Sequence, residues 1–220
     1  SPHPDDDVIS MGGTFIRLID QGHEVHVAYQ TNGSMAVHDE DVLNRLSFMR
    51  QFMKKFDLES EKIEDFSAKA KSFFQTKDVS TTDLEEILEI KALIRRREAQ
   101  SAYRFCGIDD ENAHFLALPF YKTGKAKKLA ISAEDVRITK ELLEEIKPHQ
   151  IFLAGDKSDS HGTHKTCLDI LIQAFTEIKE EGQAWVKDCW IWQYRGAWLE
   201  WPIDEIEMLV PLSPDEVAKK

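Results

Sequence analysis

The sequence is poor in cysteine, in uninterrupted apolar stretches and in positive charge. Its three cysteines are odd in number and widely spaced, so they form neither a disulfide framework nor a Cys-x-x-Cys metal site. No signal-peptide-like segment and no apolar run long enough for a membrane helix is visible in the 220 residues. The net charge of −12 argues against a surface for nucleic acid or anionic membrane. These absences predict a cytoplasmic protein that binds neither nucleic acid nor membrane.

The remaining composition is that of a globular protein, with 42% hydrophobic and 31% charged residues. Stretches with apolar residues three and four apart alternate with short strand-like runs. This alternation predicts an α/β fold that is Rossmann-like, with a mostly parallel sheet and helices on both faces. We expect helices over 7–23, 41–56, 84–108, 133–147 and 164–182, and strands within 23–33, 113–119, 149–156 and 188–198.

The length of 220 residues predicts a single domain. Residues 40–90 are helical in pattern and heavily charged, and we expect an insertion that forms a lid, an oligomer interface or a contact to another domain. The first residue already belongs to a motif without a strand before it, and the last eight residues resemble an interrupted helix. These ends predict a piece of a longer polypeptide.

Polar residues collect where the predicted strands end. Thr31-Asn32-Gly33 follows one strand, residues 156–164 follow another, and Tyr194-Arg195 follows a third. The opening residues 1–7, SPHPDDD, would join the same edge if a strand preceded them. In open α/β sheets, ligands bind outside the carboxyl ends of the strands. The sequence therefore predicts a functional site at this edge.

The three successive aspartates beside His3 require a compensating positive charge. Two imidazoles and one carboxylate form a typical catalytic zinc shell. His3 and Asp6 could supply two ligands from one turn, and His164 could supply the third from a distant loop. Asp5 could then act as general base, while His161 could stabilise an oxyanion or protonate a leaving amine.

Each of these motifs also has a structural explanation. A His-x-x-His at a helix start is often a capped surface turn, and aspartates ahead of a helix often cap it. Asp7 could be such a cap, or it could orient His3 from behind. The placement of both motifs on one edge of one sheet favours the metal interpretation.

These motifs resemble the PIG-L/LmbE family of zinc-dependent N-deacetylases, whose hallmarks are an (A/P)HPDD(E/D) segment and a later HxxH. Here they stand as PHPDDD at 2–7 and HGTH at 161–164, and the likeness extends to TNG at 31–33 and to the helix RRREAQSAYRFCGI. The resemblance implies hydrolysis of the N-acetyl group of an N-acetylglucosamine-type sugar. It also implies zinc, or another divalent metal, bound by His3, Asp6 and His164. In the same family pattern, Asp5 is the general base and His161 is the acid or oxyanion partner.

Substrate contacts are expected from a few polar side chains. Arg95 and Arg96 lie where the family has an arginine that approaches the substrate. Arg195, at the end of a strand, could contact a carboxylate or phosphate bidentately. Asn32 is the fourth candidate.

More narrowly, segments such as SPHPDDDVISMGG and KPHQIFLAGD are similar to a subgroup found behind a glucosamine-6-phosphate deaminase-like domain. This likeness implies a fused domain of that kind, or a homo-oligomer, and a sugar that could be phosphorylated. Two other functions stay open. One is a non-catalytic sugar-binding or assembly module. The other is a non-haem iron oxygenase that uses His3, Asp5 and His164.

Overall fold

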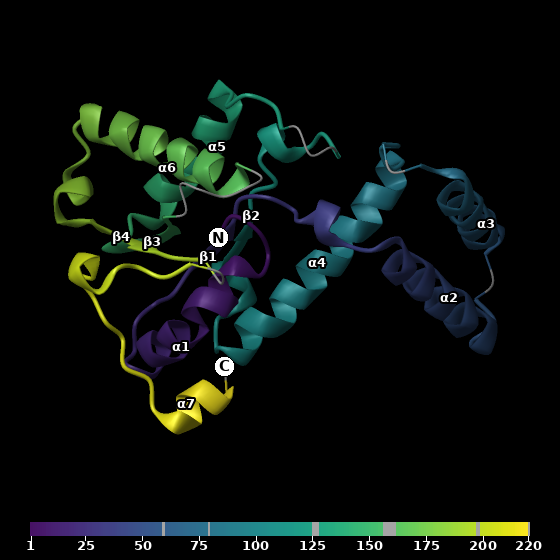
Figure 1. The fold of residues 1–220 in the computed structure, drawn as a ribbon, viewed down its shortest axis with the longest axis horizontal. Helices are drawn as coiled ribbons and strands as arrows, with labels where there is room; N and C mark the ends of the chain where they lie inside the picture. Colours follow the sequence, from purple (N-terminus) through teal and green to yellow (C-terminus); the bar gives the residue numbers. More distant parts are fainter. Residues whose placement is uncertain (59, 79, 125–127, 156–161, 197–198, 220) are drawn as a thin grey trace. The chain divides into compact units, whose positions relative to one another are not determined.

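The computed structural model describes residues 1–58, 60–78, 80–124, 128–155, 162–196 and 199–219. Within these ranges, helices and short strands follow one another as Figure 1 shows. The helices are α1 (Asp6–Asp20), α2 (Asp39–Lys55), α3 (Glu61–Thr76), α4 (Glu85–Phe105), α5 (Ala133–Ile146), α6 (Thr163–Glu180) and α7 (Pro214–Lys219). The strands are β1 (Val27–Tyr29), β2 (Ala113–Phe115), β3 (Gln150–Ala154) and β4 (Trp190–Tyr194).

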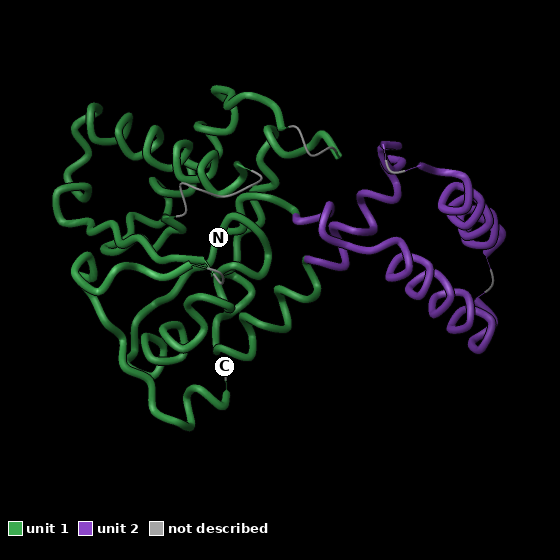
Figure 2. The backbone as a smooth tube through the Cα atoms, in the orientation of Figure 1, with its two compact units in different colours: residues 1–32, 96–220 green, residues 33–95 purple. Residues whose placement is uncertain are grey.

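The chain forms two compact units, coloured separately in Figure 2. The first contains residues 1–32 and 96–220, and the second contains residues 33–95, so the division falls inside α4. The second unit consists of α2, α3 and the first half of α4, so the charged stretch expected over about 40–90 is helical. Its core is apolar, with Val42, Ala70 and Ile87 fully buried.

A ring of four charges supports the second unit. The buried Lys91 ammonium lies 2.7 Å from Asp39 Oδ1 and 2.6 Å from Asp83 Oδ2. Lys77 contacts the other oxygens of the same two carboxylates, at 2.6 and 2.7 Å. Each charge therefore has two partners of opposite sign, which compensates the desolvation of Lys91.

The strands lie in the first unit and pair in parallel. β1 pairs with β2, with Val27 opposite Ala113, and β3 pairs with β4, with Gln150 opposite Trp190. The predicted α/β class with parallel strands is confirmed. The expected single sheet differs from what the described residues form, which is two separate two-stranded sheets. The difference arises because β1 and β3 do not pair with each other.

Two apolar cores cover these strand pairs. The first joins α1, β1, β2 and the end of α4 through residues such as Phe15, Tyr29 and Tyr103. The second joins α5, β3 and α6 through residues such as Leu153 and Ile178. Phe152 and Tyr194 pack against the first core, so the β3–β4 pair is covered on both faces.

Substitution in the second core tests its contribution. Ile178 of α6 is fully buried, whereas Ile172 of the same helix is 42% exposed. We expect Ile178→Ala to lower the free energy of unfolding by about 2–5 kcal/mol through lost burial and a residual cavity. The matched Ile172→Ala should change it by no more than about 0.5 kcal/mol. Urea unfolding monitored by tryptophan fluorescence measures the free energy of unfolding of both variants, because all five tryptophans lie between residues 185 and 201. Equal effects of the two substitutions would contradict this packing.

Candidate metal centre

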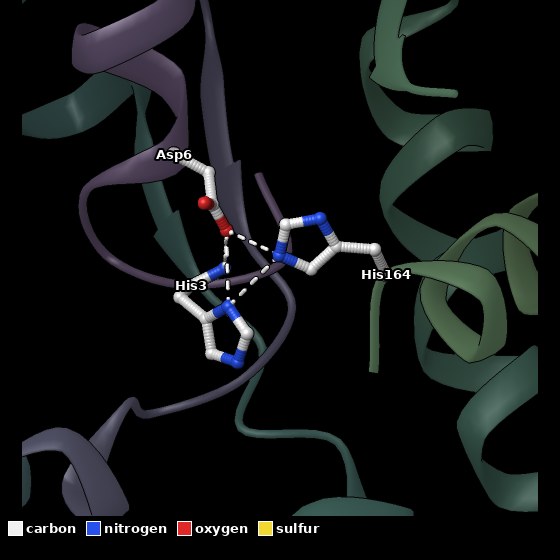
Figure 3. A group of neighbouring side chains, drawn as sticks. All are labelled: His3, Asp6 and His164. Carbon is white, nitrogen blue, oxygen red and sulfur yellow. Dashed lines mark hydrogen bonds and ion pairs between the residues drawn. The ribbon is translucent and has the colours of Figure 1, made fainter. Parts of the chain in front are cut away.

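Three candidate ligands from two elements point toward one another (Figure 3). His3 lies in the turn before α1, Asp6 is the first residue of α1, and His164 is in the first turn of α6. His3 Nδ1 lies 3.0 Å from Asp6 Oδ2 and 3.3 Å from His164 Nε2. His164 Nε2 lies 3.1 Å from the same Asp6 oxygen. Two residues predicted from one turn and one from a distant loop therefore meet.

Backbone contacts hold the N-terminal turn in place. The Thr31 amide and hydroxyl both donate to the Pro2 carbonyl, at 3.0 and 2.8 Å. The His3 amide donates to Asp6 Oδ2 at 2.9 Å, and the Asp5 amide donates back to the His3 carbonyl at 2.8 Å. The hydrogen bonds from Thr31, which lies just after β1, thus fix the position of the turn that carries His3.

Gly162 sets the position of His164. It stands at the N-cap of α6 with φ of +68°, a left-handed conformation that favours glycine. Its carbonyl accepts hydrogen bonds from the amide and hydroxyl of Thr166, at 3.0 and 2.8 Å. The glycine in HGTH therefore turns the chain so that His164 enters the helix facing Asp6.

The donor set fits a divalent metal ion. Burial by itself would raise the pKa of Asp6, but hydrogen bonds from His164 and His3 outweigh it and hold the pKa well below its ordinary value. Ligands at about 2.1 Å from a tetrahedral zinc lie about 3.4 Å from one another. The separations of 3.0 to 3.3 Å between the three donor atoms are close to this spacing. An ionised carboxylate and two imidazoles at this distance could hold zinc or a similar ion.

The other two aspartates occupy different environments. Asp5 is the N-cap residue of α1 and is half-buried. Asp7 is buried inside the first turn, so the expectation that it caps the helix is wrong. Its carboxylate accepts a hydrogen bond from the Tyr29 hydroxyl at 2.9 Å, and burial raises its pKa. The Ser1 hydroxyl contacts both Asp7 and the His3 carbonyl, which links Asp7 to the turn indirectly.

The remaining site predictions have mixed placements. The Arg96 guanidinium lies 4.4 Å from the centre of the Phe115 ring, and that of Arg195 lies 3.9 Å from the Trp201 ring. Both arginines therefore stack on aromatic rings. Asn32 follows Thr31 and is half-buried, and Arg95 belongs to the second unit. His161 lies outside the described residues.

Sequence reasoning missed Tyr121. Its ring meets the His3 ring edge-on, with 5.8 Å between the ring centroids. The Lys128 ammonium lies 3.9 Å from the centroid of the same Tyr121 ring. The turn Pro119–Tyr121 is held by the buried Asp135, which accepts a hydrogen bond from the Phe120 amide at 2.9 Å. Because this turn follows β2, the rule that pointed to the other strand ends also applies to Tyr121.

A family model described as "PIG-L: GlcNAc-PI de-N-acetylase" matches residues 1–175, a range that includes His3, Asp6 and His164. The chain belongs to the PIG-L family. The resemblance predicted from the sequence is thereby confirmed. Within the described residues, no helix of this PIG-L chain combines the length and apolar character needed to cross a bilayer.

A curated relative and a solved structure are similar to this chain. The chain is 52% identical over 221 residues to a putative glucosamine-6-phosphate deaminase-like protein of Bacteroides thetaiotaomicron. All of this chain is covered, but it spans only 33% of the length of that relative. A solved structure of N,N'-diacetylchitobiose deacetylase from Pyrococcus horikoshii, complexed with its inhibitor MPG, is 21% identical with a TM-score of 0.48. That match covers 80% of this PIG-L chain and 47% of the other.

Loss of one ligand tests the metal centre. We expect His164→Ala to weaken zinc binding by more than about 100-fold, because a direct ligand matters more than the outer contacts that support it. The matched control is His23→Ala, which removes an exposed imidazole and should leave the affinity unchanged. Calorimetric titration of the metal-stripped full-length protein with zinc measures both. Equal affinities of His164→Ala and wild type would exclude this site.

Proposed function

We propose that the chain contains the metal-dependent site of a deacetylase that removes an N-acetyl group from an amino sugar of the N-acetylglucosamine type. The observation that carries the proposal is the convergence of His3, Asp6 and His164 in a member of the PIG-L family. The naming of the 52% identical relative as glucosamine-6-phosphate deaminase-like supports the amino-sugar class and a phosphorylated substrate.

His3, Asp6 and His164 would hold zinc, or another divalent ion with the same ligand preference. The ion supplies two effects when bound: it polarises a carbonyl and lowers the pKa of water toward neutrality. Asp6 is unsuited to proton transfer because both imidazoles engage the same carboxylate oxygen. Its role is to hold the ion and to offset the charge of the cluster.

Asp5 is the proposed general base. It accepts a proton from the water whose oxygen adds to the acetyl carbonyl carbon. His161 is the proposed acid, which protonates the sugar nitrogen as the carbon–nitrogen bond breaks and acetate leaves. A carboxylate and an imidazole thus divide the two proton transfers. Support for Asp5 comes from its place beside the ligand Asp6 and from its partial exposure.

Substrate recognition is assigned to four polar residues predicted from the sequence. Arg95, Arg96, Arg195 and Asn32 are the proposed contacts to the sugar and to a phosphate. The guanidinium groups of Arg96 and Arg195 lie 4.4 and 3.9 Å from the centres of aromatic rings, and arginine is suited to bidentate binding of a phosphate. Asp7 is assigned a positioning role: it contacts the Ser1 hydroxyl, which in turn contacts the His3 carbonyl in the turn that carries the ligand.

At the level of the whole protein, we propose that residues 1–220 form a single deacetylase domain of Rossmann-like type, with an insertion over about 40–90. We also propose a cytoplasmic protein that binds neither nucleic acid nor membrane, with a fused deaminase-like domain or a homo-oligomeric assembly. A non-catalytic module is the alternative outcome of the test below. The iron-oxygenase alternative needed Asp5 as ligand, whereas the described residues group Asp6 with the two histidines.

Replacement of the proposed base tests the mechanism. We expect Asp5→Asn to lower kcat for amine release about 10²–10⁴-fold while zinc remains bound, because the amide cannot accept the proton. Asp20→Asn, at the exposed end of the same helix, is the matched control and should retain wild-type kcat. Fluorescamine detection of free amine from N-acetylglucosamine and its 6-phosphate gives the rates.

Retained kcat in Asp5→Asn would remove Asp5 from the mechanism. Stoichiometric zinc without amine release in wild type, from either sugar, would favour the non-catalytic module. The ratio of kcat/KM for the two sugars decides whether phosphate is recognised.

A further inference from the structure

One side of α2, in the second unit, exposes a row of phenylalanine rings. Phe48, Phe52 and Phe56 follow one another at four-residue intervals and are 66%, 46% and 58% exposed. Neighbouring rings lie close together, with 6.2 Å between the first two centroids and 4.7 Å between the second two. Met49, next to Phe48 in the chain, is exposed as well. Single exposed apolar residues are ordinary, but a contiguous patch such as this aromatic row marks a surface that binds a partner.

The core of the second unit uses a different side of the helix. α2 buries Val42 and Leu46 in that core. Arg50 Nε donates a hydrogen bond to Glu64 Oε1 of α3 at 2.7 Å. An α-helix turns by about 100° per residue, so Phe48 and Phe52 stand about 160° around α2 from Arg50. The aromatic row therefore lies on the side of α2 that is turned away from this contact with α3.

The charges on the same side of α2 are self-complementary. Asp41 stands seven residues before Phe48, and Lys55 stands seven residues after it; both charged residues are exposed. Seven residues make nearly two full turns, so all three lie on one line along the helix. When this line is reversed end for end about Phe48, the lysine takes the place of the aspartate. A second α2 in antiparallel orientation therefore matches the first in charge as well as in apolar character.

We propose that the aromatic row is an interface between two copies of this chain, whose α2 helices pack antiparallel about a two-fold axis at Phe48. Phe48 meets Phe48 of the partner subunit at the axis. Asp41 lies opposite the partner subunit's Lys55, and the symmetry forms the same pair a second time, as an isologous contact requires. Arg45, also exposed, falls against the partner's Phe52, where its guanidinium can make a cation–π contact.

The charge pattern of α2 favours a second copy in this orientation. Its first turn is acidic, with Asp39, Glu40 and Asp41, and its last turn is basic, with Lys54 and Lys55. Antiparallel pairing sets these opposite ends against each other, whereas parallel pairing would set each end against its own charge, which disfavours association. The aromatic rings then form the apolar centre of the contact and the charges form its rim, the usual arrangement of a protein–protein interface.

Disulfide cross-linking of the full-length protein tests the orientation. The double variant Asp41→Cys/Lys55→Cys should form covalent dimers on oxidation, because the antiparallel contact brings these two positions of different copies together. Each single variant should give less than about a tenth of that yield, since its two cysteines would stand about 21 Å apart along the helices, beyond the reach of a disulfide. The wild type, in which Cys106 and Cys167 are buried, gives the background. No cross-linking in the double variant, or equal yields in a single variant, would overturn the proposal.

The molar mass of the full-length assembly tests the aromatic row itself. Phe48→Glu should reduce the mass measured by light scattering to about half, because it places two like charges at the axis. Phe105→Glu, at a position of α4 that is 68% exposed, is the counterpart and should leave the mass unchanged. Both variants should keep the far-ultraviolet circular dichroism of the wild type, since neither side chain is buried. A monomeric wild type, or an unchanged mass of Phe48→Glu, would show that something other than a second copy covers the row and would overturn the proposal.

Discussion

The contact of the Asp6 carboxylate with two imidazoles is the interaction on which the account of this protein depends. One oxygen of Asp6 meets His3 from its own turn and His164 from α6, more than 150 positions along the chain. Without a counter-charge, this cluster would leave three adjacent aspartates beside the start of one helix. The divalent ion proposed above would supply that charge, and hydrogen bonds from His3 and His164 hold the pKa of Asp6 low, which keeps its carboxylate ionised.

Parallel strand topology explains why these residues meet. The turn at His3 is held by Thr31 after β1, Tyr121 follows β2, and His164 follows β3. Each element delivers its polar residues to the same edge because parallel strands end there together.

Much of this arrangement could be predicted from the sequence. The helices at α1, α4, α5 and α6 follow from apolar spacing. The grouping of His3, Asp6 and His164 follows from two motifs whose residue types are typical of a metal site. Asp7 shows the limit of such prediction. The sequence does not reveal that Asp7 is buried, where its carboxylate accepts a hydrogen bond from the Tyr29 hydroxyl, and that it therefore does not cap the helix. Tyr121 shows another limit: it follows a strand, as the other site residues do, but an aromatic side chain does not by itself indicate a metal site, and only the structure places its ring against His3. The division of the strands into two separate pairs could not be predicted either, because it depends on which strand edges pair through their backbones.

The central claim is that the ion held by His3, Asp6 and His164 is required for amide hydrolysis. The most direct measurement is the rate of amine release from N-acetylglucosamine 6-phosphate and from N-acetylglucosamine as metal-stripped full-length protein is titrated with zinc. The account predicts no rate without metal and a rise that saturates at one equivalent per chain. Full activity in metal-free protein, or no amine release from either sugar at one bound equivalent, would contradict it.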